Sequence, residues 1–257
     1  MGRRFAPDAF GPVKVALIGY CPPAAILESY RPRCFEEQHF IHVSPDSVRV
    51  LSHNGRQYLS LAHVYGGPVS SSTVEELAYY GIELILAYGL AGGLGTKDLK
   101  MGAFYAVDDA FVADGTTRHY SSNSIIAADR QLVAQTHDSW MGRNARAALV
   151  NVRAATGDAI YRENDLLLDR FRAEGCDIVN LDSAHLYAVS IDNAAGRTIR
   201  AIQCGVISDI VTGGSNFKSE STLSAMLAKG DQGLNPLSLT SEIVSFYIES
   251  LLPALGY

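Results

Sequence analysis

Two aspartates each follow a short apolar run, at a place where a carboxyl group can act on a bound molecule. Asp209 follows the run 199–207 with Ser208 between them, and Asp182 follows the run 178–181. A carboxyl group that loses contact with water at a strand end is held partly protonated and suits a general acid, the chemistry expected of Asp209. A carboxylate also accepts hydrogen bonds from a sugar diol, the functional interpretation of Asp182. The structural alternative for both is a helix cap or a turn.

A third apolar run ends in glycine. Residues 89–95 read Gly-Leu-Ala-Gly-Gly-Leu-Gly and follow the run 82–88. Glycine lets the backbone approach a ligand closely and adopts positive φ values. The segment has neither the P-loop pattern nor a good dinucleotide-binding pattern. It predicts either a backbone approach to a ligand or a tight turn from strand to loop.

These residues depend on strands and helices that bring them to one edge of a sheet. Strands are predicted over residues 13–18, 48–51, 57–64, 82–88, 104–112, 148–155, 178–181 and 199–207. Helices are predicted over 24–29, 70–80, 127–136, 164–174, 183–196 and 240–252, with Ser71, Ser72 and Thr73 as cap candidates for the second and Gly196 at the end of the fifth. Asn-Gly at 54–55 predicts a hairpin.

The alternation of strands and helices predicts an α/β fold. We expect a central mixed, mostly parallel sheet flanked by helices, in which ligands bind beyond the carboxyl ends of the strands. No repeat or linker divides the chain, so we expect a single domain over 1–257 with a core of about 13–252.

The composition excludes several classes of protein. Of 257 residues, 47% are hydrophobic and 19% are charged, which indicates a folded globular chain. The net charge of −6 leaves no basic surplus for binding nucleic acid. No apolar run approaches the roughly 20 residues of a membrane span, and residues 1–8 contain no signal-peptide core. The four cysteines have no metal-ligand spacing and suggest a reducing compartment, so we expect a cytoplasmic protein.

Four motifs, taken in order, resemble the nucleoside phosphorylase superfamily, which contains purine nucleoside phosphorylase, uridine phosphorylase and methylthioadenosine/adenosylhomocysteine nucleosidase. Gly-Leu-Ala-Gly-Gly at 89–93 resembles the family's Gly-Ser/Thr-x-Gly-Gly/Ala loop. Val-Asn-Leu-Asp-Ser-Ala at 179–184 resembles Val-Glu-Met-Glu-Ser/Gly-Ala, and Val-Ile-Ser-Asp at 206–209 resembles Val-Ser-Asp. Segment 156–163 is similar to the base-pocket segment. The resemblance covers roughly 13–252 and implies the family's fold and cleavage of the N-glycosidic bond of a nucleoside.

The resemblance implies a role for each matching residue. Asp209, positioned by Ser208, falls on the acid that protonates or hydrogen-bonds N7 of a leaving purine, so a purine-type base is expected. Asp182 falls on the residue that binds the ribose hydroxyls, with Leu181 and Asn180 in the same motif. The residues expected at the base are Ile160, Tyr161, Asp158, Ala91, Gly92 and Gly93, with Tyr161 as the better stacking candidate.

The phosphate ligands of the phosphorolytic members are missing. Their Arg and Ser/Thr positions are occupied by Pro23, Ala87 and Leu90, and the Gly-Asp-Pro-x-Arg motif of the first strand end is replaced by Gly-Tyr-Cys-Pro-Pro at 19–23. Guanidinium and hydroxyl donors normally hold phosphate, so their loss favours hydrolysis.

The resemblance does not identify the residue that activates water, and it leaves two alternatives to hydrolysis. The water-activating Glu of the hydrolytic members falls at Ala24, and Glu28 one turn later is a weak substitute. The first alternative is a phosphorylase with displaced ligands, for which Gly19 and Arg49 are the suspects, with Arg31 and Arg33 nearby. The second is a catalytically silent relative that binds a nucleoside. A Rossmann-type cofactor binder is disfavoured by the sequence 19–23.

The resemblance also implies the partners. It implies a small-molecule nucleoside, with phosphate in the phosphorolytic alternative, and no metal or organic cofactor. A homo-oligomer is expected, a dimer, trimer or hexamer whose subunits share active sites. A partner histidine often contacts the 5′ side of the ribose in this family, and the sequence does not choose among His39, His42 and His119.

Overall fold

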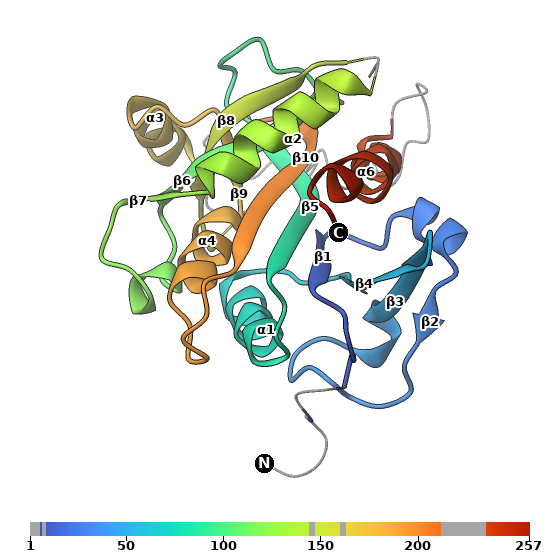
Figure 1. Ribbon diagram of the computed structural model, residues 1–257. Helices are drawn as coiled ribbons and strands as arrows, with labels where there is room; N and C mark the ends of the chain where they lie inside the picture. Colours follow the sequence, from blue (N-terminus) through green and yellow to red (C-terminus); the bar gives the residue numbers. More distant parts are fainter. Residues whose placement is uncertain (1–5, 7–8, 144–146, 160–162, 212–234) are drawn as a thin grey trace.

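The computed structural model of the chain describes residues 6, 9–143, 147–159, 163–211 and 235–257 (Figure 1). The strands are β1 Val15–Tyr20, β2 Arg33–Cys34, β3 Val48–His53, β4 Arg56–Leu61, β5 Leu84–Gly93, β6 Phe104–Val112, β7 Ile125–Ala127, β8 Leu149–Thr156, β9 Ile178–Asn180 and β10 Arg200–Ile210. The α-helices are α1 Gly67–Tyr79, α2 Arg130–Gly142, α3 Asp165–Ala173, α4 Ser183–Ile191, α6 Pro236–Phe246 and α7 Leu252–Ala254. A 3-10 helix, Ala25–Tyr30, follows β1, further 3-10 turns lie at Pro45–Ser47 and Thr117–His119, and π-helix Tyr247–Leu251 joins α6 to α7.

The strands form one mixed sheet, as the sequence predicted. Strand β5 lies at its centre and runs parallel to β1 on one side and to β10 on the other. Strand β10 pairs antiparallel with β6, β6 and β8 pair in parallel, and β9 links β8 back to β5. These pairings close part of the sheet on itself and bring the ends of β5, β8, β9 and β10 together.

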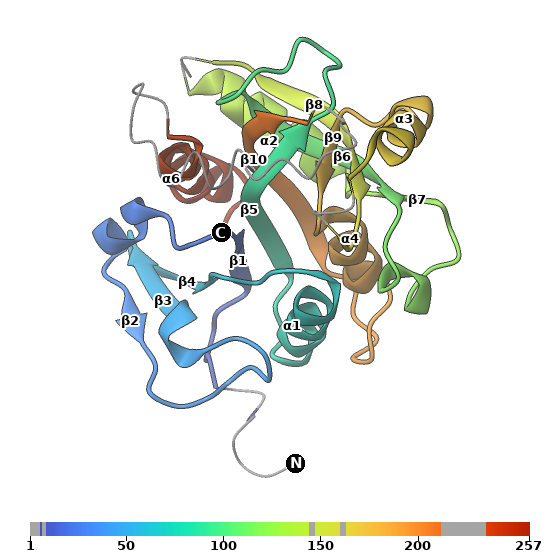
Figure 2. The same ribbon diagram turned by 180° about the vertical axis from the view of Figure 1, so that it is seen from behind.

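Helices cover both faces of the sheet. Along β1, Val15 and Leu17 pack with the residues of α6 and with Trp140 of α2, whereas Ala16 and Ile18 pack with α1 and α4. This alternation follows from the period of two in a strand, and continuous burial on both sides explains the unbroken apolar runs. Figure 2 shows α1 and α4 on the face opposite to α2 and α6.

Two strands are longer than predicted. The glycine segment 89–93 does not turn away after the apolar run but continues β5, and Ser208 and Asp209 lie within β10 rather than beyond it. The cause is the parallel pairing of β5 with β10, which extends from Leu84 opposite Arg200 to Gly93 opposite Ile210. The alternative of a tight turn at 89–93 is therefore wrong.

The helix ends also differ from the predictions. Helix α1 begins at Gly67 with Gly66 as its N-cap, so Ser71, Ser72 and Thr73 lie inside the helix, where their hydroxyls donate to carbonyl oxygens of the preceding turn. Helix α2 begins at residue 130 because the preceding residues form β7, and Asp129 caps it.

The end of α4 and the start of α6 were misplaced by five and four residues, whereas both ends of α3 lie within one residue of the prediction. Helix α4 ends at Ile191, so Gly196 falls in the turn that follows. The last helix begins earlier than predicted, at Pro236, because Asn235 accepts a hydrogen bond from the Leu237 N–H and Pro occupies the first turn. Within the described part of the chain, every helix is too short or too polar to cross a bilayer.

Candidate active site

Asp209 and the glycine segment of β5 lie side by side. Asp209 pairs with Gly92 across the two strands, and a register shift between Ile207 and Asp209 leaves Ser208 as a bulge. The buried Ser208 hydroxyl donates to Asp209 Oδ1 at 2.5 Å and lies 3.1 Å from the Ala91 carbonyl oxygen. Bulges commonly redirect a side chain at functional sites. Here the bulge places the Ser208 hydroxyl against Oδ1 of the half-buried Asp209, and Oδ2 accepts no hydrogen bond from any of the described residues.

Gly92 and Gly93 have neighbours that account for their lack of a side chain. A Cβ atom on Gly92 would collide with the side chain of Val211, and one on Gly93 would lie 2.8 Å from Ile210 Cδ1. The clash at Gly92 is severe, whereas the Ile210 side chain near Gly93 is exposed and could move aside. Ala91 is buried, and its carbonyl oxygen faces Ser208.

Asp182 is buried without full hydrogen bonding. It occupies the N-cap position of α4, but its side chain accepts no capping hydrogen bond, so the capping interpretation is wrong. Its exposed fraction is 5%, and Oδ1 has no partner among the described residues. Burial raises the pKa of this carboxyl well above its usual value, and only the backbone N–H groups of Gly66 and Leu181 oppose the shift. A buried oxygen without a hydrogen bond indicates a place where a ligand could bind, because buried polar groups are almost always hydrogen-bonded.

Tyr65 and Cys21 lie close to Asp182. Burial raises the pKa of Tyr65 to about 12, and the charges of Cys21 and Asp182 add to that shift. Burial, and then the charge of Asp182, raises the pKa of Cys21 to about 12, so its thiol stays protonated. The sequence analysis gave neither residue a role, although Cys21 directly follows β1, which lies beside β5; Tyr65 lies four residues after the end of β4.

Asn180 holds the motif in place from inside. Its Oδ1 accepts from the Asp182 N–H at 3.2 Å, and its Nδ2 donates to Ser183 Oγ at 2.6 Å. Ser183 Oγ in turn donates to Gln203 Oε1 at 2.7 Å, which joins the start of α4 to β10. The amide of Asn180 is thus engaged by the protein itself and orients Asp182.

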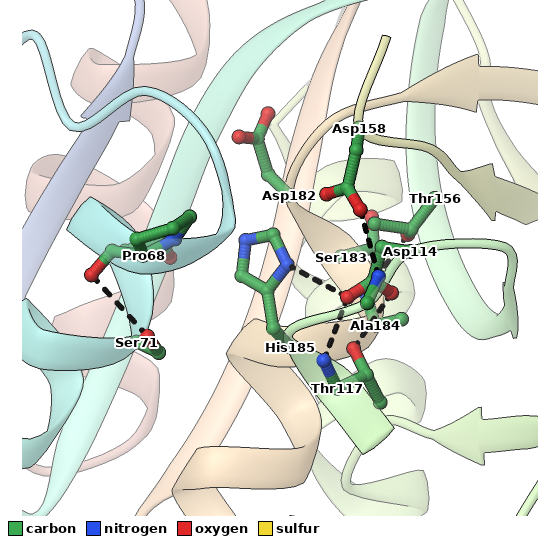
Figure 3. A network of polar contacts seen from close by, with 12 residues as sticks. Pro68, Ser71, Asp114, Thr117, Thr156, Asp158, Asp182, Ser183, Ala184 and His185 are labelled. Carbon is green, nitrogen blue, oxygen red and sulfur yellow. Dashed lines mark hydrogen bonds and ion pairs between the residues drawn. The ribbon is translucent and has the colours of Figure 1, made fainter. Parts of the chain in front are cut away.

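Asp158 lines a cavity of about 420 Å³ next to Leu181. Its Oδ2 accepts a hydrogen bond from the Gly115 N–H at 2.7 Å (Figure 3). The described residues that line this cavity are Gly66, Gly67, Pro68, Gly115, Thr116, His119, Gly157, Asp158 and Leu181. None of these described lining residues lies on β5 or β10, so this cavity groups Asp158 with Leu181 and not with the glycine segment of β5. The predicted base contacts Ile160 and Tyr161 lie outside the described residues.

Glu163 is a second carboxyl group near Asp209. It is half-buried, and burial followed by the charge of Asp209 raises its pKa to about 7. The sequence analysis included Glu163 in the segment 156–163 without giving it a role. Glu163 directly precedes Asn164, the N-cap of α3, and nothing in the local sequence indicated that it lies near Asp209 on β10.

The two candidate phosphate ligands, Gly19 and Arg49, are in contact with neighbouring side chains. A Cβ atom on Gly19 would lie 2.7 Å from Tyr88 Oη, so the Tyr88 ring fills the space over Gly19. Arg49, on β3, donates to Glu28, whose side chain is 68% exposed. This ion pair engages both the suspected phosphate ligand and the substitute water activator.

The comparison of the sequence with family models decides the class of the protein. The model of the phosphorylase superfamily matches residues 14–229. The chain belongs to the phosphorylase superfamily. An uncharacterized protein of Acanthamoeba polyphaga mimivirus is 26% identical over 239 residues, which are 90% of each chain.

Solved structures of superfamily enzymes share the fold. Native futalosine hydrolase of Helicobacter pylori is 16% identical with a TM-score of 0.71, covering 92% of this chain and 97% of that one. The 5′-methylthioadenosine/S-adenosyl homocysteine nucleosidase of Helicobacter pylori is 17% identical with a TM-score of 0.71, covering 92% and 98%. Uridine phosphorylase from Vibrio fischeri is 17% identical with a TM-score of 0.67, covering 94% and 90%. These similarities confirm the predicted α/β fold.

Proposed function

We propose that this protein is a nucleosidase that hydrolyses the N-glycosidic bond of a purine-type nucleoside to free base and ribose or a modified ribose. The observation that carries the proposal is the buried Asp182 carboxyl, whose Oδ1 has no partner among the described residues. Asp209 on β10 and Val179, three residues before Asp182, pair with the same residue of β5, Gly92. The superfamily's members and the neighbouring solved structures include nucleosidases, which supports this class of reaction.

Asp182 binds the sugar in this proposal. A neutral carboxyl group has one O–H donor and free acceptor capacity, and two adjacent ribose hydroxyls offer the complementary set. Its raised pKa favours this neutral form in the absence of ligand. The hydrogen bonds from a diol would satisfy the buried oxygen that the protein leaves open.

Asp209 acts on the leaving base. Ser208 holds Oδ1, and Oδ2, which has no hydrogen bond among the described residues, would carry the proton or hydrogen bond to a ring nitrogen of the purine. Burial, and then the charge of Asp209, raises the pKa of Glu163 to about 7, so Glu163 carries a proton near this group below that pH. Protonating the base as the C–N bond breaks makes it a better leaving group.

The side chains around Gly19 and Arg49 support hydrolysis rather than phosphorolysis. Tyr88 fills the space over Gly19, and Arg49 is paired with Glu28. A phosphate dianion would have to displace these groups before it could meet a guanidinium donor. Water needs no such site, although a residue that activates it is not assigned here.

The proposal is tested by measuring base release from adenosine, inosine, guanosine, methylthioadenosine, adenosylhomocysteine and uridine, with and without phosphate. We expect release from at least one purine nucleoside without phosphate, and its loss in Asp209→Asn. Asp169→Asn is the matched control because Asp169 is exposed and paired with Arg172 on α3. Turnover that requires phosphate would establish the phosphorylase alternative, and tight nucleoside binding without turnover would establish the silent relative.

We also propose that the chain works as a homo-oligomer in the cytoplasm, as the resemblance to the family implies. Light scattering after size-exclusion chromatography measures the mass directly. A mass of 27.7 kDa would show a monomer and contradict the proposal.

A further inference from the structure

His185 is a buried imidazole that the proposed reaction does not use. It lies on α4, three residues after Asp182, with no exposed surface. Neither ring nitrogen has a hydrogen-bond partner among the described residues, and Nδ1 lies 3.9 Å from Asp114 Oδ1 (Figure 3). Burying an imidazole in this way costs free energy that an apolar side chain would not cost. The contact with Asp114 is therefore the feature to explain.

Asp114 organises a turn beyond the end of β6. Its exposed fraction is 5%, and its carboxylate accepts from the Thr117 N–H at 2.6 Å and from Thr117 Oγ1 at 2.7 Å. Burial alone would raise the pKa of Asp114, but the nearby His185 imidazole and the hydrogen bonds from Thr117 outweigh it and hold the pKa below its usual value. Asp114 is thus a buried carboxylate, and Nδ1 is the ring nitrogen of His185 that faces it.

The turn that Asp114 organises forms one wall of the cavity beside Leu181. Gly115, Thr116 and His119 contribute to the lining. The turn is held from two directions: Asp158 accepts from the Gly115 N–H after β8, and His185 reaches Asp114 from α4. Helix α4 also begins at the residue after Asp182.

We propose that His185 and Asp114 are positioning residues that fix the turn 114–119 relative to the sugar-binding Asp182. Helix α4 carries both Asp182 and His185, so the contact with Asp114 ties the cavity wall to the carboxyl that binds the sugar. His185 itself does not touch the substrate, because it has no exposed surface. The kinetic consequence of this arrangement rests on the proposed function, whereas the structural consequence does not.

The structural consequence is tested by hydrogen exchange of the Thr117 amide, which donates to Asp114. His185→Phe keeps a ring of similar size but removes the donor, and His185→Gln restores a donor. His137→Phe is the matched control, because His137 contacts Asn151 far along the chain from the turn. We expect exchange on the order of tenfold faster in His185→Phe, recovery in His185→Gln, and no change in the control. Unchanged exchange in His185→Phe, in a variant that remains folded, would overturn the proposal.

The kinetic consequence is a change in KM rather than in kcat. We expect His185→Phe to raise KM for the best substrate on the order of tenfold with kcat within about twofold, because small displacements in a binding site weaken positioning. Equal loss in kcat with unchanged KM would overturn the positioning role. If the wild-type protein has no activity, the proposed function fails, while the exchange experiment still decides whether His185 fixes the turn.

Discussion

The proposed base side and the proposed sugar side of the site each contain an aspartate carboxyl group, but the two groups differ in burial and in hydrogen bonding. On β10, Asp209 is half-buried, and the protein satisfies one of its oxygens through Ser208. At the start of α4, Asp182 is buried, and the protein leaves one of its oxygens without a partner. The first arrangement suits a group that exchanges a proton during the reaction. The second suits a group whose remaining hydrogen bonds are made by a bound ligand.

The difference arises from the local backbone. The bulge at Ser208 puts a hydroxyl next to Asp209, whereas Asp182 follows a three-residue strand, and among the described residues its hydrogen-bond donors are the backbone N–H groups of Gly66 and Leu181. A carboxyl group after a buried strand is therefore not one kind of site. Its role depends on which donors the neighbouring elements supply.

The largest expected effect is on the base side. Asp209→Asn keeps the shape of the side chain but removes its acidity, so we expect kcat to fall by roughly 10² to 10⁴ with little change in KM. Steady-state kinetics on the best purine nucleoside would measure this, with Asp169→Asn as control. A rise in KM at constant kcat would show that Asp209 only binds, which would erase the contrast between the two aspartates.

Asp182→Asn tests the sugar side through activity and stability together. We expect kcat/KM to fall on the order of 100-fold, because a carboxyl that matches the diol is lost. At pH 7 we expect the folded state to gain about 1 kcal/mol, or roughly 2–4 °C in Tm, because a buried group with raised pKa is removed.

The pH dependence of that stability gain has a definite sign. The folded state holds the Asp182 proton more tightly than the unfolded chain, so wild-type stability falls as pH rises above the unfolded pKa of about 4. The gain in Asp182→Asn should therefore shrink as pH approaches 4. A variant that loses stability at pH 7 would contradict the account of Asp182 as an unsatisfied group.

Glu163→Gln sharpens the account of the base side. With the pKa of Glu163 at about 7, this carboxyl near Asp209 loses its proton as pH rises through that value, and activity should fall. In Glu163→Gln we expect this fall to move or disappear, with kcat at pH 6 reduced only a few-fold. Glu174→Gln, at an exposed residue after α3, is the control. An identical pH profile in Glu163→Gln would remove Glu163 from the site.

Phosphate should have the smallest effect. Because Tyr88 fills the space over Gly19 and Arg49 is paired with Glu28, we expect phosphate to change the rate of base release by less than about twofold. Initial rates across a phosphate titration at constant ionic strength would measure this. A saturable increase in rate would reveal an anion site formed by displaced ligands.

Much of the fold was predictable because its strands are buried on both faces. The prediction for 104–112 matches β6, and the Asn-Gly pair correctly predicted the hairpin between β3 and β4, with Asn54 and Gly55 both at positive φ. The ends of elements were less predictable. Helix α1 starts without a side-chain cap, and β5 continues through its glycines because β10 pairs with it, which no local pattern reveals.

The candidate site was predictable only where a motif marked it. The sequence singled out Asp209, Ser208 and Asp182, and the structure brings Ser208, Asp209 and Ala91 into contact. Glu163 and the unsatisfied state of Asp182 could not be predicted, because both depend on burial by residues distant in the chain.

The most direct test of hydrolysis at this site is the fate of phosphorus during turnover. The wild-type protein and its best purine nucleoside are incubated with excess inorganic phosphate, and the reaction is followed by ³¹P NMR as the base is released. We predict that free base accumulates while all phosphorus stays inorganic, and that Asp209→Asn releases almost no base. A sugar 1-phosphate signal that grows in step with the free base would contradict the account.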